Sequence, residues 1–104
     1  MYELKFFEFE VRIKGIAEEI KKHSDIKNIY GISRGGLIPA VRLSHLTGLP
    51  LTNNPNKNYT VIIDDCIDSG QTKLKFKDYK YYFVLIDKQK ENINEWIAFW
   101  WEVR

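Results

Sequence analysis

Val61-Ile-Ile-Asp-Asp-Cys-Ile-Asp-Ser-Gly-Gln-Thr72 is the stretch of sequence from which the fold can be inferred. Its first three residues are contiguous, apolar and β-branched, which is typical of a parallel strand covered on both faces. Two adjacent carboxylates, Asp64 and Asp65, follow at the expected carboxyl end of this strand. Ligands of open α/β sheets bind at that end, because the loops leaving the strands form a crevice there.

The loop at 68–72 combines small, hydroxylated and acidic residues. Gly70 permits a tight turn, and the hydroxyls of Ser69 and Thr72 add donors to the backbone N–H groups, as a phosphate site requires. Paired carboxylates beside such a loop indicate a ligand that carries a phosphate together with hydroxyls or a metal ion. Mg²⁺ prefers carboxylate oxygens and water together with substrate phosphates. The alternative is a strand end followed by an ordinary Asp-Ser-Gly turn.

A second strand, loop and helix precede this segment. A strand is predicted from Ile26 to Ile32, and the loop Ser33-Arg34-Gly35-Gly36 follows it directly. The apolar pattern from Leu37 to Leu46 then predicts a largely buried helix, which Gly48 and Pro50 end. Backbone N–H groups, a helix N-terminus and a guanidinium together suit an anion. The alternative is a tight turn with a solvent-facing arginine.

The two segments together resemble the type I phosphoribosyltransferases. Asp64 to Thr72 is similar to that family's signature for phosphoribosyl pyrophosphate (PRPP), which has two acids, two apolar residues and then Asp-Ser/Thr-Gly-x-Thr. Ser33-Arg-Gly-Gly-Leu-Ile-Pro39 resembles the pyrophosphate loop of bacterial xanthine-guanine phosphoribosyltransferases. The resemblance runs from about Ile29 to Glu102. It implies an α/β fold in a minimal form: a mostly parallel sheet flanked by helices, with a small aromatic C-terminal hood.

Composition sets limits on the whole chain. We expect residues 1–104 to form one compact domain. A net charge of +2 demands neither nucleic acid nor an anionic membrane as a partner. The single cysteine, Cys66, excludes an intramolecular disulfide, and we interpret it as a small buried residue of the loop rather than a nucleophile. No apolar run approaches transmembrane length and the N-terminus lacks a signal-peptide pattern, so a cytoplasmic location is expected.

Other elements follow from periodicity. Apolar residues at helical spacing predict a packing helix from about residue 7 to 23, and 82–87 reads as another buried strand. The segment 73–80 is ambiguous: its alternation favours a strand, whereas the family expects a helix, and we expect one or two helical turns leading to a strand. Its lysines, with neighbouring aromatic residues, also allow a nucleic-acid site. A solvated face is the more common meaning of such a charge run.

The purine site is expected near the C-terminus. A lysine at the end of the corresponding strand recognises the 6-oxo group in purine phosphoribosyltransferases, and Lys88 matches that position, with Lys90 as a second candidate. Trp96 to Glu102 resembles the base-binding hood of the xanthine-guanine enzymes, with Trp100 in place of a proline. By that match Trp96 stacks on the purine and Ile97 contacts its edge. The alternative for the aromatic residues is that Phe99 and the two tryptophans after it cap the sheet as core.

The reaction implied by the resemblance transfers the phosphoribosyl group of PRPP to a 6-oxopurine, giving a nucleoside monophosphate and pyrophosphate. Arg34 and the backbone of 33–36 would hold pyrophosphate, and Asp64 and Asp65 would orient the ribose hydroxyls and a hydrated Mg²⁺. Asp68 would handle the purine N7 proton, or would close the phosphate loop as a structural residue. The expected substrate-binding residues are Ser33, Arg34, Gly35, Gly36, Asp64, Asp65, Asp68, Ser69, Gly70, Gln71, Thr72, Lys88, Trp96 and Ile97. A homodimer is the expected assembly.

The chain departs from the family at Leu51 to Thr60. Type I enzymes usually carry a much longer flexible loop between the two phosphate motifs, which closes over PRPP and excludes water. Only a short polar segment is present here. Two other functions therefore stay open: a PRPP- or nucleotide-binding module without turnover, and a lysine-mediated nucleic-acid binder.

Overall fold

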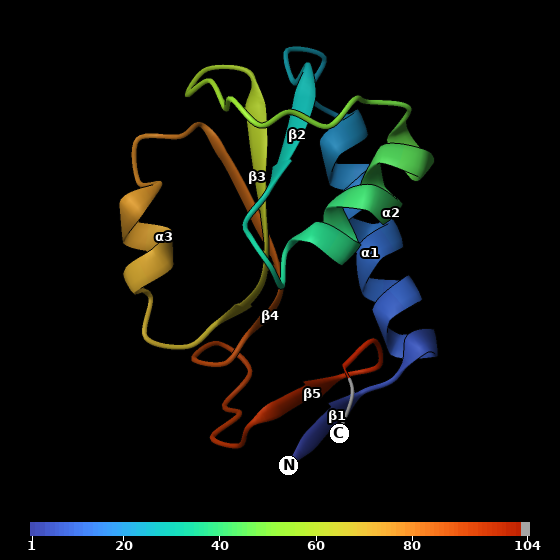
Figure 1. Ribbon diagram of the computed structural model, residues 1–104, viewed down its shortest axis with the longest axis vertical. Coiled ribbons are helices and arrows are strands. Elements are labelled where there is room, and N and C mark those ends of the chain that lie inside the picture. The colour runs from blue at the N-terminus through green and yellow to red at the C-terminus, as the bar shows by residue number, and fades with distance from the viewer. Residues whose placement is uncertain (103–104) are drawn as a thin grey trace.

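The computed structural model of the chain describes residues 1–102. A three-stranded sheet carries helices on both faces, and a separate two-stranded sheet lies at one end of the molecule (Figure 1). The elements are, in chain order, β1 (Tyr2–Leu4), α1 (Phe6–Lys21), β2 (Asn28–Gly31), α2 (Leu37–Thr47), β3 (Thr60–Ile67), α3 (Gln71–Lys75), β4 (Tyr81–Asp87) and β5 (Ile97–Phe99).

The three-stranded sheet has the order β2-β3-β4, and every strand pair in residues 1–102 is parallel. Tyr30 pairs with Ile62, and Ile63 pairs with Phe83. The apolar run at the start of β3 is fully buried, as its lack of alternation predicts. The predicted α/β class with a parallel sheet is therefore confirmed. The strand predicted at 26–32 is shorter and spans only β2.

Helices α1 and α2 cover one face of this sheet (Figure 1). The predicted packing helix is confirmed as α1, whose buried side chains are Phe9, Ile13, Ala17 and Ile20. α2 lies very close to the end of β2, because a Cβ added to Gly31 would come within 2.7 Å of the Ala40 Cβ. α2 ends at Gly48, whose φ of +78° is the left-handed conformation that glycine adopts without strain.

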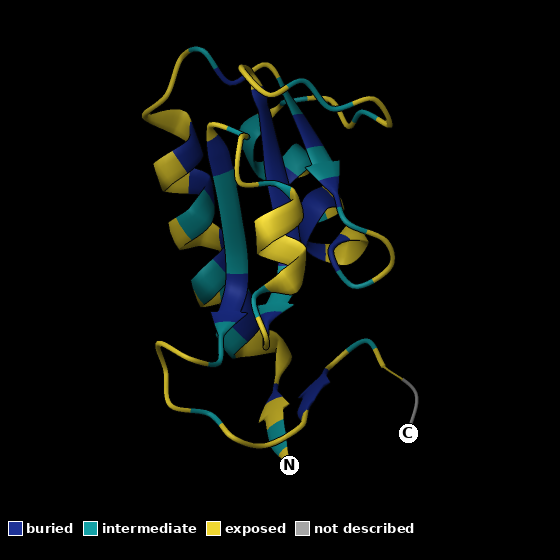
Figure 2. Cartoon of the chain, turned by 90° about the vertical axis from the view of Figure 1, so that its left-hand side faces the viewer, coloured by how far each residue is buried: buried dark blue, intermediate teal, exposed yellow. Residues whose placement is uncertain are grey.

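The opposite face of the sheet is thinly covered. The segment 73–80, whose structure the sequence left ambiguous, forms the end of the short helix α3 and a turn after it. α3 has no buried residue (Figure 2). The Phe76 ring lies 6.2 Å from the Tyr30 ring and 6.4 Å from the Tyr82 ring, so aromatic side chains cover much of what a longer helix would. With five residues, α3 contributes little helix dipole to the loop before it.

Strands β1 and β5 form the two-stranded sheet, which we call the hood, at the end of the molecule where the chain leaves β3 and β4 (Figure 1). Leu4 pairs with Phe99. No strand was predicted at β1. The alternative that the aromatic residues serve as core is supported for Phe99, which is buried in one cluster with residues of β3 and β4, and for Trp101, which packs against that cluster. The Trp100 and Trp101 rings lie 5.5 and 5.7 Å from the ring of Phe9, at the start of α1.

The polar segment 51–59 lies at the amino ends of the strands, away from the hood (Figure 1). Tyr59 accepts a backbone hydrogen bond from Lys27, and Lys57 accepts one from Lys80, residues that lead into β2 and β4. The short polar segment between the two phosphate motifs therefore does not lie over the predicted site, which is at the other end of the strands. None of the helices in residues 1–102 combines the length and the apolar character needed to cross a bilayer.

Candidate active site

The two predicted anion loops meet at the carboxyl ends of β2 and β3. Loop 33–36 joins β2 to α2, and the Asp65 carboxylate lies directly against Gly35, where a Cβ would overlap it. The Ile32 N–H donates to the Ile63 carbonyl at 2.9 Å, so the sheet ladder continues up to the start of this loop. Strand pairing thus brings motifs about thirty residues apart in sequence into one site.

Asp64 and Asp65 lie within β3 rather than after it. Pairing continues past them, because Cys66 pairs with Ile86 and Ile67 pairs with Asp87. Asp64 is only 6% exposed. Its Oδ1 accepts the Asp65 N–H at 2.9 Å, and its Oδ2 accepts the Tyr82 hydroxyl at 2.9 Å. Asp64 is therefore held inside the protein by two hydrogen bonds, whereas Asp65 is the acid beside loop 33–36.

Burial and mutual repulsion make it unfavourable for both of these carboxylates to be ionised at once. Burial raises the pKa of Asp65, and its hydrogen bond and charge interaction with Asp64 raise it further. Burial and the Asp64 carboxylate also raise the pKa of Tyr82, so its hydroxyl stays protonated and available as a donor. An unligated acid pair of this kind favours a bound cation or a hydrogen-bond donor.

Loop 33–36 supplies fewer anion donors than the sequence suggests. The Gly36 N–H donates to the Ile32 carbonyl at 2.8 Å and is therefore already used. Gly36 has a steric role instead, because a Cβ there would lie 2.8 Å from the Ile32 N and O atoms. The Ser33–Arg34 peptide bond is cis, and Arg34 is exposed at the mouth of the loop. Backbone groups of 33–35 and the Arg34 guanidinium remain as candidate donors.

Loop 68–70 turns sharply into α3. Gly70 has a φ of +89°, and the Ser69 hydroxyl accepts the Gln71 N–H at 3.3 Å. The Gln89 side chain donates to the Asp68 carbonyl at 3.0 Å, which ties this loop to the turn after β4. Gln71 and Thr72 form the first turn of α3.

A cavity of about 190 Å³ separates loop 68–70 from the hood. It brings together four residues predicted from sequence: Asp68, Lys88, Trp96 and Ile97. The Lys88 ammonium lies 3.6 Å from the Asp68 carboxylate, and the Lys88 side chain is 13% exposed. Trp96 is 73% exposed, so its ring forms an open wall. Lys90 lies instead in a groove with Lys73 and Glu91, which favours Lys88 as the cavity's cation.

Sequence reasoning missed three residues that line this cavity, namely Cys66, Phe99 and Glu102. Cys66 is not part of a loop but a half-buried residue of β3. Burial, followed by the Asp65 charge, raises the pKa of its thiol to about 11, so it is protonated near neutral pH and is a poor nucleophile. The sequence held one indication that Cys66 lies near the site. Side chains two positions apart in a strand are on the same face of the sheet, so Cys66 shares a face with Asp64.

Comparison with solved structures agrees with this arrangement. A purine phosphoribosyltransferase from Pyrococcus horikoshii OT3 matches 99% of this chain and 94% of its own, with a TM-score of 0.74 and 24% identity. The chain has a phosphoribosyltransferase fold. The Helicobacter pylori xanthine-guanine-hypoxanthine phosphoribosyltransferase matches 98% of this chain and 92% of its own, with a TM-score of 0.72 and 16% identity.

A third structure with this phosphoribosyltransferase fold is the Leishmania tarentolae HGPRT-ase in complex with GMP. It matches 88% of this chain and 71% of its own, with a TM-score of 0.51 and 16% identity. No protein-family model and no curated protein sequence matches the chain. The fold is thus preserved at an identity too low for sequence comparison to detect.

Proposed function

We propose that this protein is a phosphoribosyltransferase of the type I family that transfers the phosphoribosyl group of PRPP to a 6-oxopurine. One observation carries the proposal. Two anion loops and a carboxylate pair meet at the carboxyl edge of a parallel sheet, beside a cavity bounded by a lysine and an exposed tryptophan. Such an arrangement fits a ligand with two phosphate groups, a sugar and a planar base. The likeness to a purine phosphoribosyltransferase over nearly the whole chain supports the proposal.

The proposed reaction exchanges one bond at C1 of the ribose for another. A purine ring nitrogen forms a bond to C1, the bond from C1 to the pyrophosphate oxygen breaks with its electron pair, and the purine loses its ring proton. Arg34 and the backbone of 33–35 stabilise the charge that develops on pyrophosphate. The 68–72 loop holds the 5′-phosphate, with the Ser69 and Thr72 hydroxyls as donors.

The purine would lie in the cavity between Lys88 and Trp96. Trp96 offers an open aromatic face for stacking, and Ile97 forms the apolar edge. Lys88 would donate to the 6-oxo group, and Asp68 would accept the purine N7 proton. The 3.6 Å separation of Lys88 and Asp68 puts a donor and an acceptor at one end of the cavity, as a purine edge with both functions requires.

Mg²⁺ fits the acid pair but has few protein ligands there. Within residues 1–102, no three acidic, histidine or cysteine side chains converge as a metal site. Asp65 is the carboxylate turned toward loop 33–36, and Asp64 lies behind it. When bound with PRPP, the ion would neutralise phosphate charge and be held by Asp65, water and PRPP oxygens. Asp64 then acts mainly by fixing the backbone and charge of Asp65.

The direct test is nucleotide synthesis. Purified protein is incubated with PRPP, Mg²⁺ and guanine, xanthine or hypoxanthine, and nucleoside monophosphate and pyrophosphate are quantified, with adenine as the control base. Equal amounts of both products from a 6-oxopurine would support the proposal. PRPP binding without either product would leave only the binding-module function.

The binding module stays a second candidate because of the 51–59 segment. That segment lies at the amino ends of the strands, so it does not shield the site from water. Calorimetry of Mg²⁺-dependent PRPP binding distinguishes it from a nucleic-acid binder, which would instead show salt-sensitive affinity for DNA or RNA that is lost when the α3 lysines are neutralised.

A further inference from the structure

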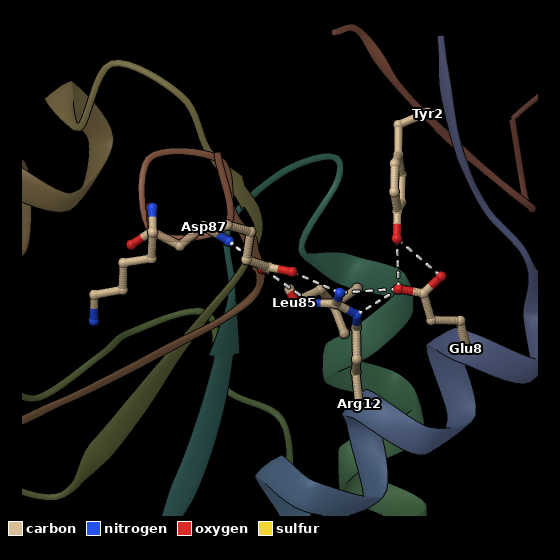
Figure 3. Close-up of polar contacts among 7 residues, drawn as sticks. Tyr2, Glu8, Arg12, Leu85 and Asp87 are labelled. Atoms are coloured by element: carbon tan, nitrogen blue, oxygen red, sulfur yellow. Dashed lines mark hydrogen bonds and ion pairs between the residues drawn. The ribbon is translucent and has the colours of Figure 1, made fainter. Parts of the chain in front are cut away.

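Arg12 lies at the centre of a polar network outside the proposed substrate contacts (Figure 3). Its Nη1 donates to the Leu85 carbonyl at 2.8 Å. Nη1 and Nη2 hold the Glu91 carboxylate at 3.0 and 2.6 Å. On the other side, Nε and Nη2 contact Glu8 Oε2 at 3.0 and 2.9 Å. Four hydrogen bonds and one further ion-pair contact thus engage all three guanidinium nitrogens, an arrangement that the single ammonium of lysine does not reproduce.

Glu8 connects Arg12 to the hood. The Tyr2 hydroxyl donates to the two Glu8 oxygens at 3.1 and 2.8 Å. Figure 3 shows the Tyr2 ring extending from the hood strand down to Glu8 on α1. The Tyr2 backbone N–H donates to the Trp96 carbonyl at 2.9 Å. One residue thus joins Arg12's network to the proposed stacking residue.

Glu91 connects Arg12 to the other wall of the cavity. The Asp87 N–H donates to Glu91 Oε2 at 3.2 Å, and the Lys88 N–H directly after it donates to the Ile67 carbonyl at 3.0 Å. Arg12 lowers the pKa of Glu91 through their hydrogen bonds, so this carboxylate stays ionised. The Leu85 contact fixes Arg12 to the free edge of β4 two residues before Asp87.

We propose that Arg12 is a positioning residue for the purine, which sets the separation between Trp96 on the hood and Lys88 after β4. The proposal rests on the proposed function, because it assigns the purine to this cavity. Its physical basis is that a two-stranded sheet of three-residue strands is marginal by itself and takes its place from its attachments. No hydrogen bond between described residues joins loop 33–36 or loop 68–70 directly to Glu8, Leu85 or Glu91, and loop 68–70 reaches the turn that contains Glu91 only through Gln89 and Lys88. PRPP binding should therefore depend on this network much less than purine binding does.

The test compares Arg12→Lys with Tyr2→Phe and a matched control. Arg12→Lys keeps the positive charge but loses the planar guanidinium that binds Glu8 and Glu91 at the same time. Tyr2→Phe removes only the hydroxyl that donates to Glu8 from the hood. Arg42→Lys is the control, because Arg42 makes a comparable ion pair with Glu10 on α1, at 2.9 Å, away from the cavity. The measurements are the KM for purine, the KM for PRPP and backbone hydrogen exchange.

Arg12→Lys is expected to raise the purine KM about tenfold and to change the PRPP KM less than about twofold. Tyr2→Phe should give a smaller rise of the same kind, about threefold. The Tyr2 and Trp100 amides, which donate to Trp96 and Leu4, should exchange faster in both variants than in Arg42→Lys. If Arg12→Lys does not fold, Tyr2→Phe decides the question alone.

Equal increases in both KM values, or purine KM values equal to that of Arg42→Lys, would overturn the proposal. If the wild-type protein synthesises no nucleotide, the proposed function is rejected, which is a separate result from rejection of the positioning role. The variants are then compared by their affinity for GMP instead of by the KM for purine. Unchanged GMP affinity and unchanged hood exchange in Arg12→Lys would then reject the positioning role itself.

Discussion

Tyr82 keeps the buried Asp64 carboxylate oriented, although it is not a ligand residue in the sequence motif. Tyr82→Phe leaves Asp64 Oδ2 without its hydroxyl donor in a buried environment. We expect unfolding to become easier by about 1–2 kcal/mol and Mg²⁺-dependent PRPP affinity to fall roughly tenfold, because Asp65 loses its fixed neighbour. Thermal melts and titration calorimetry measure the two effects. Tyr30→Phe is the control on the same face of the sheet, and an equal loss of affinity there would contradict this role.

Gly35 determines whether loop 33–36 fits against the Asp65 carboxylate of β3. Gly35→Ala puts a methyl group where the Asp65 carboxylate lies, so either the loop or the carboxylate must move. PRPP affinity should fall by a factor of about ten or more, with a small change in stability because the loop is at the surface. Calorimetry with PRPP and Mg²⁺ measures this.

Gly15→Ala serves as the control for Gly35→Ala. Gly15 lies within α1 and has no heavy atom within 4 Å of an added Cβ. It should stabilise the protein by about 0.5–1 kcal/mol and leave PRPP affinity unchanged. Full PRPP affinity in Gly35→Ala would show that the contact with Asp65 is not required.

At the scale of elements, Asp25 joins the loop after α1 to the start of β4. The Lys80 ammonium lies 2.6 Å from Asp25 Oδ2, and the Tyr81 hydroxyl donates to both carboxylate oxygens at 2.6 and 2.7 Å. These hydrogen bonds, that of Lys80 foremost, lower the pKa of Asp25 to about 2. Because the folded pKa lies below the usual 3.8, the stabilisation is complete above about pH 4 and disappears as the pH falls toward 2.

Asp25→Asn should therefore lower the melting temperature at pH 7 by roughly 2–5 °C and should match the wild type near pH 2. Melting curves from pH 2 to 7 measure this difference. Asp78→Asn is the control, because Asp78 lies 4.0 Å from Lys57 in an exposed pair and should change the melting temperature little. A pH-independent difference would mean that Asp25 acts by shape rather than charge.

At the scale of the whole molecule, an apolar surface formed by α1, α2 and Trp100, which follows β5, is left uncovered by residues 1–102. Phe7, Phe6 and Trp100 are 80%, 53% and 43% exposed, and a groove of about 380 Å³ lies between α1 and α2. These three side chains alone expose on the order of 350 Å². That area lies within the range of about 300–600 Å² for the largest apolar patch of a monomer, patches that are often functional, and is nearly half of the roughly 800 Å² that each partner buries in a standard interface.

We therefore expect a homodimer through this surface, to which Phe7 contributes the most exposed of the three rings. Phe7→Glu should convert the dimer to a monomer, because a buried carboxylate without a partner opposes association. Light scattering during size-exclusion chromatography gives the mass. Leu74→Glu, at a 65% exposed residue of α3, is the control and should leave the mass unchanged. A wild-type monomer at micromolar concentration would contradict the expectation.

Local sequence was sufficient for most elements and for the positions of the two loops at 33–36 and 68–70. The contiguous apolar residues before Asp64 predicted a buried parallel strand, and the spacing from Phe9 to Ile20 predicted α1. The end of β3 was misjudged, because carboxylates there belong to the ladder with β4, and such pairing is set by a strand twenty residues away. β1 was missed for the same reason: three residues carry no periodic signal without their partner β5.

The sequence by itself determined which chemistry the chain carries: two phosphate-type loops, an acid pair, and a lysine and a tryptophan near the C-terminus. Fixed spacing and local turn residues encode these features, because each depends on neighbours within a few positions. Only the tertiary structure decided which acid faces the loops, that Lys88 rather than Lys90 lies in the cavity with Trp96, and that Arg12 joins the cavity's two walls. Those relations depend on strand register and on side chains up to 79 positions apart, distances over which a single sequence carries no readable pattern.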